Sequence, residues 1–69
     1  MEVELSRPEL IVPLMQTLRS LDCSCMRIAR NRCAVFHRTA ADPREALIEL
    51  TFFLRAWQGQ HEPVELLLS

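Results

Sequence analysis

Hydrophobic and polar residues alternate at the start of the chain and then change to helical spacing. Val3 and Leu5 alternate with glutamates, which predicts a short strand with one buried face. The segment Ser6-Arg7-Pro8-Glu9 has the form of a helix capping box, with Pro8 at the first helical position. Pro13 lies in the following helix and lacks an amide hydrogen, so we expect a kink or an irregular first turn there. The predicted helical stripe consists of Leu10, Ile11, Leu14, Met15, Leu18 and Leu21.

The apolar spacing returns to two between Cys23 and Thr39. Two strand-like stretches, 23–28 and 33–38, flank the turn Ala29-Arg30-Asn31-Arg32, in which Asn31 can adopt a positive φ. This pattern predicts a β-hairpin.

A second helix start follows at Asp42-Pro43-Arg44-Glu45, with Asp42 as the N-cap and Pro43 at the first position. Gly59 is the expected C-terminal stop of this helix. A final strand is predicted beyond Pro63, with one face formed by Val64, Leu66 and Leu68. The side chains expected to face the core from the second helix are Leu47, Leu50, Leu54 and Trp57, with Ala46 and Phe53 beside them.

The order strand, helix, strand, strand, helix, strand predicts an α+β domain of the ferredoxin-like βαββαβ type. In this fold a four-stranded antiparallel sheet, in the order four-one-three-two, carries both helices on one face. No repeat, linker or low-complexity tract divides the chain, so we expect residues 1–69 to form a single domain.

The hairpin register decides which side chains remain on the open face of this sheet. We expect Ile28 to pair with Cys33, because this register gives the more apolar inner face. Met26 then pairs with Val35. A shift of one residue would move one strand's side chains to the other face, so the opposite assignment stays open. In the expected register the open face carries Cys23, Cys25, Arg27, Ala34, Phe36 and Arg38.

The composition favours association with a partner. A chain of 69 residues buries only about 60% of its unfolded surface, yet 49% of these residues are hydrophobic. Phe36 on an open sheet face would need a cover. Arg27 on the second strand and Glu65 on the fourth could pair across a two-fold interface. We therefore predict a homo-oligomer, a dimer as the first guess, with the contact residues Arg27, Ala34, Phe36, Arg38 and Glu65.

Charge and targeting signals limit the function classes. The net charge of −1 gives no general preference for nucleic acid or acidic membranes. Met1 is followed by no signal-peptide pattern, and no apolar run reaches the length of a membrane span. We expect a cytoplasmic protein without membrane association, whose three cysteines are reduced thiols.

Cysteine and histidine are the candidate residues for chemistry. Cys23 and Cys25 alternate along a strand, and Cys33 is expected on the opposite face, which is a poor arrangement for a metal site. Cys33 and His37 are separated by about 13 Å along one strand, too far for a hydrogen bond between nucleophile and base. We therefore predict no catalytic residue, no metal, no cofactor and no enzymatic activity.

Arginines gather around the hairpin, and RNA-recognition domains share the predicted topology. Those domains stack bases on aromatic residues of their first and third strands. Here the third strand offers Phe36 alone, and the first strand has no aromatic residue. A nucleic-acid-binding domain that uses Arg27, Arg30, Arg32 and Arg38 is nevertheless the alternative function.

The segment Ser6-Arg7-Pro8-Glu9-Leu10-Ile11, placed between a short strand and a helix, resembles the Arg-Pro-Gly-Leu entry of ACT-type regulatory domains. The run from Leu18 to Cys23 into the next strand fits the same layout. The resemblance implies a regulatory module that pairs with another copy and binds an amino acid at the interface. Ser6, Arg7 and Glu9 are then the ligand-binding candidates, because helix amides and Arg7 can hold a carboxylate. We predict a non-enzymatic regulatory or protein-interaction module that self-associates through its sheet and could bind such a small ligand.

Overall fold

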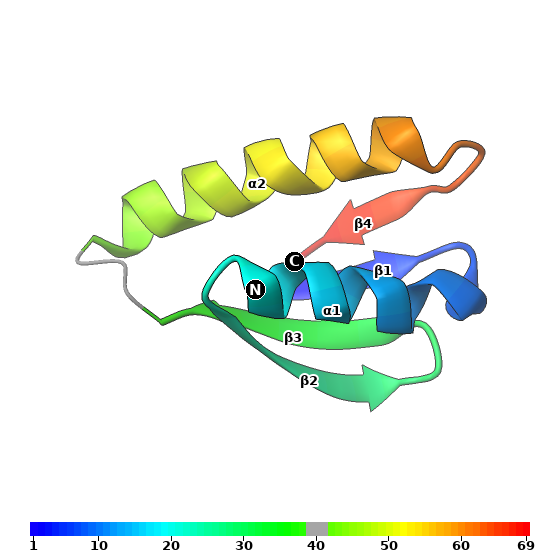
Figure 1. Ribbon diagram of the computed structural model, residues 1–69, viewed down its shortest axis with the longest axis horizontal. Helices are drawn as coiled ribbons and strands as arrows, with labels where there is room; N and C mark the ends of the chain where they lie inside the picture. Colours follow the sequence, from blue (N-terminus) through cyan, green and yellow to red (C-terminus); the bar gives the residue numbers. More distant parts are fainter. Residues whose placement is uncertain (39–41) are drawn as a thin grey trace.

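The computed structural model describes residues 1–38 and 42–69, so Thr39, the end of the predicted period-two stretch, lies outside the described residues. The elements are β1 (Glu2–Leu5), the 3-10 turn η1 (Pro8–Leu10), α1 (Ile11–Ser20), β2 (Cys23–Ala29), β3 (Arg32–His37), α2 (Pro43–Gln60) and β4 (Leu66–Leu68) (Figure 1). The strands form one antiparallel sheet in the order β2-β3-β1-β4. Counted from β4, this is the predicted order, and the predicted α+β class is confirmed.

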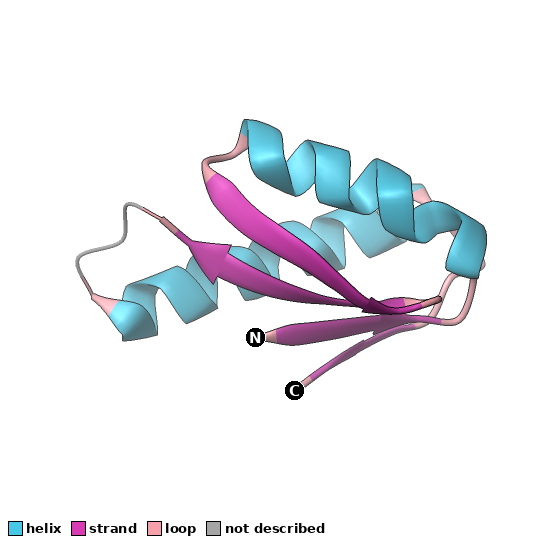
Figure 2. Cartoon of the chain, turned by 90° about the horizontal axis from the view of Figure 1, so that it is seen from below, coloured by secondary structure: helices cyan, strands magenta, loops and turns pink. Residues whose placement is uncertain are grey.

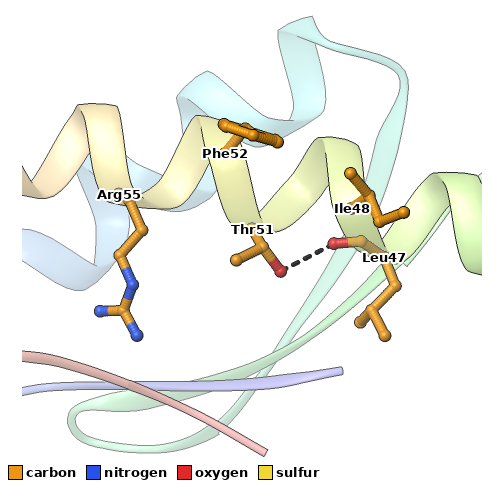
Figure 3. Close-up of a pocket in the computed structure, with 5 residues that line it drawn as sticks. All are labelled: Leu47, Ile48, Thr51, Phe52 and Arg55. Atoms are coloured by element: carbon orange, nitrogen blue, oxygen red, sulfur yellow. Dashed lines mark hydrogen bonds between the residues drawn. The ribbon is translucent and has the colours of Figure 1, made fainter.

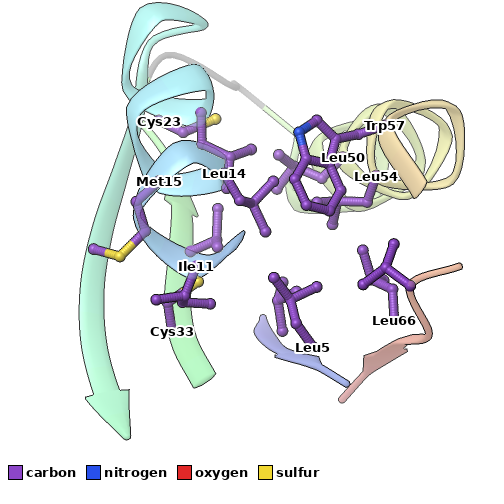
Figure 4. Packing of buried hydrophobic residues seen from close by; sticks show 14 residues of the cluster. Leu5, Ile11, Leu14, Met15, Cys23, Cys33, Leu50, Leu54, Trp57 and Leu66 are labelled. Carbon is purple, nitrogen blue, oxygen red and sulfur yellow. The ribbon is translucent and has the colours of Figure 1, made fainter. Parts of the chain in front are cut away.

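One hydrophobic core lies between the sheet and the two helices (Figures 2 and 4). α1 packs over β2 and β3, whereas α2 packs over β4. Alternation along β1 directs Val3 and Leu5 to the core and leaves Glu2 and Glu4 on the other face. The buried cluster consists of Val3, Leu5, Ile11, Leu14, Met15, Leu18, Cys23, Cys33, Val35, Leu50, Leu54, Trp57, Val64 and Leu66.

The start of α1 differs from the predicted capping box. Ser6 Oγ accepts a hydrogen bond from the amide of Glu65 at 2.8 Å, and Glu9 pairs with Arg7 at 2.7 Å. Neither side chain therefore caps the helix, and η1 leads into α1 instead. Pro13 falls in the first turn of α1, where amide hydrogens have no helical partner. The expected irregular first turn is thus confirmed as a 3-10 turn, and Pro13 fits without a lost hydrogen bond.

α1 ends at a residue in the left-handed conformation. Asp22 has a φ of 64°, and its amide donates a hydrogen bond to the carbonyl of Arg19 at 3.3 Å. The Asp22 carbonyl accepts from the amide of Arg38 at 3.1 Å, and its Oδ1 lies 3.3 Å from Arg38 Nη2. Asp22 therefore both terminates the helix and holds the far end of the hairpin.

The predicted start of α2 is confirmed. The Asp42 side chain accepts a hydrogen bond from the amide of Arg44 at 2.9 Å, and Pro43 occupies the first turn. Leu50, Leu54 and Trp57 are buried as predicted. The prediction was wrong for one member of this stripe, Leu47, which is 53% exposed.

The predicted stop of α2 at Gly59 is wrong, because the helix continues through Gln60. The His61 ring stacks on Trp57, with ring centroids 4.1 Å apart, and His61 Nδ1 lies 2.8 Å from the Trp57 carbonyl oxygen. These contacts close the last turn without a glycine in the left-handed conformation.

The predicted hairpin register is also wrong. Cys33 pairs with Arg27 instead of Ile28, and the same shift of one residue continues along β2. β2 therefore presents the opposite set of side chains to the helices: Cys23 and Cys25 lie on the inner face. The predicted pair Met26–Val35 is replaced by the pairs Cys25–Val35 and Met26–Ala34.

A β-bulge causes this difference. The turn consists of Arg30 and Asn31, since Ala29 pairs with Arg32, but the ladder is irregular between Arg27 and Ala29. Ile28 is the extra residue, and one extra residue reverses the orientation of every side chain that precedes it in the strand. Asn31 anchors the turn to β1, because its Nδ2 donates to the carbonyl of Leu5 at 2.9 Å.

Candidate interaction surfaces

The open face of the sheet carries an apolar patch over β2 and β3. Met26 is 64% exposed and Phe36 59% exposed, and both lie on the face opposite the core. Met26 pairs with Ala34, which places the two larger side chains diagonally across adjacent strands. We call Met26, Ala34 and Phe36 the open-face patch. Exposed apolar groups of this kind mark binding surfaces.

Charged residues border this patch on β1. Glu2 pairs in the sheet with Ala34, and Glu4 lies between Arg32 on β3 and Leu67 on β4. Arg32 Nη2 lies 3.0 Å from Glu2 Oε1, so Arg32 neutralises one of the two carboxylates. The open face therefore combines the apolar patch over β2 and β3 with the ion pair of Arg32 and Glu2 and with Glu4 on β1. Leu67 on β4 adds an exposed apolar side chain beyond Glu4.

The predicted interface residues are only partly brought together. Phe36 and Ala34 lie on the open face as predicted, but Arg27 lies on the inner side with Cys33. Arg27 Nη2 donates to the carbonyl of Arg30 at 2.7 Å, so its guanidinium closes its own hairpin. Arg38 pairs with Asp22, and Glu65 is exposed just before β4. The arginines expected to meet Glu65 of another copy are thus engaged within their own chain.

The predicted ligand-binding residues lie together in the loop after β1. Arg7 Nε donates to Glu9 Oε1 at 2.7 Å, and Ser6 Oγ is occupied by the amide of Glu65. The pKa of Glu9 is lowered by a hydrogen bond from its own backbone amide and then by Arg7. Arg7 and Glu9 are therefore paired with each other, and Ser6 fixes the backbone of the segment that precedes β4.

A second apolar surface lies on α2 and was missed in the sequence. Ile48 and Phe52 form the outer face of α2, with Phe52 75% exposed, whereas exposed Leu47 lies on the side of α2 that borders Met1 and Leu68. Together with Thr51 and Arg55 they line a shallow apolar hollow of about 450 Å³ (Figure 3). The signal was present in the apolar doublets Leu47-Ile48 and Phe52-Phe53, because two neighbours on a helix cannot both face one core.

The two outer strands of the sheet are covered at their edges by arginines from the helices. Arg19 Nη2 on α1 lies 3.4 Å from the carbonyl oxygen of Cys25 on β2. Arg55 Nη1 on α2 donates to the carbonyl oxygen of Leu66 on β4 at 3.0 Å. Charged side chains at sheet edges oppose the addition of another strand. The faces of this molecule are therefore more accessible to a partner than its edges.

The three cysteines occupy one face of the sheet, which corrects the expectation that Cys33 points away from the other two. Burial raises the pKa of all three thiols, and that of Cys33 to about 11. Thiols with raised pKa values stay protonated near neutral pH and are weak nucleophiles.

His37 lies beside these thiols, opposite Cys23 across the strand pair. Its Nε2 is 3.6 Å from Glu49 Oε2 on α2. Within residues 1–38 and 42–69, no group of three histidine, cysteine or acidic side chains is arranged to hold a metal ion.

No helix among the described residues has both the length and the apolar character needed to cross a bilayer. Comparison with known proteins gives no relative, since no family model, curated protein or solved structure matches the chain. The two apolar surfaces are therefore the main evidence for function.

Proposed function

We propose that this chain is a ferredoxin-like, non-enzymatic interaction module that associates with a second copy of itself through the open face of its sheet. The observation that carries the proposal is the exposure of Phe36 and Met26 in the middle of that face. The ferredoxin-like assignment rests on the strand order and on the placement of both helices against one face.

The energetics require most of the open-face patch to be covered. A fully buried Phe or Met side chain contributes about 1.5–3 kcal/mol. Association costs roughly 4–15 kcal/mol in lost translational and rotational freedom. One side chain cannot offset this cost, so the complex needs Met26 and Phe36 from the patch and an equivalent apolar surface on the other copy.

The sheet edges support contact through a face. Because Arg19 holds the Cys25 carbonyl of β2 and Arg55 the Leu66 carbonyl of β4, a strand added at either of these positions would displace a guanidinium. The open face needs no such displacement, since its apolar side chains already point into solvent.

Ligand binding and nucleic-acid binding have less support. Arg7 is paired with Glu9, so a carboxylate ligand would have to replace an existing ion pair. Around the hairpin, Arg32 is paired with Glu2 and Arg38 with Asp22, which reduces the positive charge available to phosphates.

Sedimentation equilibrium of the native chain and of Phe36→Asp, each at low and high salt, tests the proposal. We expect the native chain to associate at both salt concentrations and Phe36→Asp to be a monomer with an unchanged circular dichroism spectrum. Val12→Asp is the matched control, because Val12 is a half-exposed apolar residue on α1, away from the open face. A native monomer at all concentrations, or an associating Phe36→Asp, would show that the open face is not the contact surface.

A further inference from the structure

A small hollow lies between α2 and the far end of the hairpin, apart from both apolar surfaces. We propose that it binds a small, uncharged, apolar molecule with one hydroxyl group, and that this hydroxyl bridges His37 and Glu49. The inference does not depend on the proposed function, because the open-face patch contributes no side chain to the hollow. The lining residues are Leu21, Cys23, His37, Glu49, Leu50 and Phe53.

The hollow forms where several elements meet. Cys23 at the start of β2 pairs with His37 at the end of β3, on the core side of the sheet. α2 contributes Glu49 and Phe53, which are four residues apart and therefore lie on one side of the helix. Leu21 lines the hollow from the turn between α1 and β2. The site thus combines apolar walls with two polar side chains from different elements.

The folded chain leaves the hydrogen-bonding capacity of His37 unused. Its side chain is only 17% exposed. Within residues 1–38 and 42–69, its Nδ1 is the one buried side-chain nitrogen or oxygen that has no hydrogen-bond partner. A buried polar atom without a partner lowers stability, and native proteins retain few of them. His37 is therefore not explained by a stabilising role, and we look for a ligand that uses its ring.

The other ring nitrogen faces Glu49 across a gap. His37 Nε2 lies 3.6 Å from Glu49 Oε2, well beyond the usual N–H···O distance of about 2.9 Å. A proton on Nδ1 would be a buried donor without an acceptor, whereas a proton on Nε2 faces a carboxylate. The neutral ring therefore carries its proton on Nε2, and a donor and an acceptor stand side by side without a direct hydrogen bond.

A hydroxyl group is complementary to this pair, because it accepts one hydrogen bond and donates another. It accepts from His37 Nε2 and donates to the Glu49 carboxylate, and with two bonds of about 2.8 Å its oxygen spans the gap. An ammonium group has no lone pair for the Nε2 proton, and the charge of Glu49 repels an anion.

The apolar walls and the volume limit the rest of the ligand. Leu50 is buried, Phe53 is half-buried and Leu21 is exposed at the rim, so the ligand body contacts hydrocarbon on several sides. The hollow has a volume of about 230 Å³. A cavity of about 150 Å³ is enough for benzene. A single ring with a short hydroxyl-bearing arm, such as benzyl alcohol, therefore fits the site.

Benzyl alcohol and toluene differ by one hydroxyl group, so NMR titration of the native chain with each at pH 8 tests the site. We expect benzyl alcohol to bind about tenfold more tightly than toluene and to shift the resonances of His37. Benzylamine, which carries an ammonium group, should bind more weakly than benzyl alcohol. Equal binding of benzyl alcohol and toluene, tighter binding of benzylamine, or no binding at all would each overturn the inference.

Variants assign the preference to the two polar side chains. His37→Phe keeps a ring but removes both nitrogens, and Glu49→Ala removes a carboxylate that is 69% exposed. In each variant the preference for benzyl alcohol over toluene should fall to about twofold or less. Glu45→Ala is the matched control, because Glu45 is an exposed acidic residue one turn earlier on α2 that does not line the hollow. It should keep the native preference.

Glu49→Ala decides the result if His37→Phe loses its native circular dichroism spectrum, since an exposed helix position tolerates alanine. A tenfold preference that persists in Glu49→Ala would show that the hydroxyl does not bridge the pair. A preference lost equally in Glu45→Ala would show that the effect is not specific to the hollow.

Discussion

Arg55 Nη1 donates a hydrogen bond to the carbonyl oxygen of Leu66 at 3.0 Å, so a side chain of α2 covers the outer edge of β4. The same nitrogen lies 3.0 Å from Gln58 Oε1, and Gln58 Nε2 donates to the carbonyl of Val64 at 3.0 Å. The guanidinium thus ties the short last strand to the long helix and occupies an acceptor that another strand could otherwise use.

We predict that Arg55→Ala lowers the free energy of unfolding by about 1 kcal/mol, because a carbonyl at the edge of β4 loses its partner. The measurement is urea denaturation in the Phe36→Asp background, where association does not contribute. Arg44→Ala is the matched control, since the Arg44 side chain makes no hydrogen bond or ion pair among the described residues and lies near the helix start, where positive charge is unfavourable. Equal losses in the two variants would contradict a stabilising role for the Arg55–Leu66 bond.

We predict that alkaline pH destabilises the fold through its thiols. The pKa of Cys33 rises from about 9 to about 11 on burial, so the unfolded chain releases this proton at lower pH than the folded chain. The stabilisation is fully present below pH 9 and is lost as the pH rises from 9 to 11. With neither lysine nor tyrosine in the sequence, cysteines are the side chains that titrate in this window.

The alkaline effect is measured as the free energy of unfolding between pH 8 and pH 11 under reducing conditions, and a loss of about 2 kcal/mol is expected. Cys33→Ala should be less stable than the native chain near neutral pH, because it leaves a small cavity. It should also lose less stability on going to high pH. An identical alkaline decrease in both proteins would assign the effect to other groups.

We predict that two substitutions of Asp22 differ in how much stability they lose. Both Asp22→Gly and Asp22→Ala remove the contact between the carboxylate and Arg38, but only glycine adopts the left-handed conformation at no steric cost. Asp22→Gly should therefore be more stable than Asp22→Ala by about 1 kcal/mol. Thermal denaturation of the two variants side by side is the measurement, and equal stability would mean that φ at this position is not constrained.

We predict that His61→Ala exposes the single tryptophan of the chain. Trp57 is buried, and the His61 ring covers one of its faces at a centroid distance of 4.1 Å. Loss of this ring should shift the fluorescence emission of Trp57 to longer wavelength and cost about 1 kcal/mol of stability. Gln60→Ala, one residue earlier and exposed, should leave the emission unchanged. An emission maximum that does not move in His61→Ala would show that other side chains cover Trp57.

The order of elements could be predicted because each element has its own periodicity and the helices have recognisable starts, such as Asp42-Pro43. The hairpin register could not be predicted, because β2 has apolar residues in both of its alternating sets. Cys23 and Cys25 belong to one set, and Met26 and Ile28 belong to the other. Binary patterning cannot choose between two such sets, and the bulge at Ile28 decides.

The candidate surfaces were predicted in part for a similar reason. Phe36 follows directly from alternation along β3, so its position on the open face needs no knowledge of β2. The outer face of α2 was missed because the buried stripe of Leu50, Leu54 and Trp57 accounts for the helix without Ile48 and Phe52. The engagement of Arg27 and Arg38 within the chain depends on contacts between residues that only the folded hairpin brings together.

The bulge at Ile28 also gives β2 one residue of spare length. If a single codon were lost between Cys25 and Ala29, the strand could become regular, keep the Ala29–Arg32 pair, and still set Cys25 opposite Val35. An inserted residue would instead reverse the faces on which all preceding side chains of β2 lie. We therefore expect the loss of one residue from this segment to disturb the buried positions of Cys23 and Cys25 less than the gain of one residue.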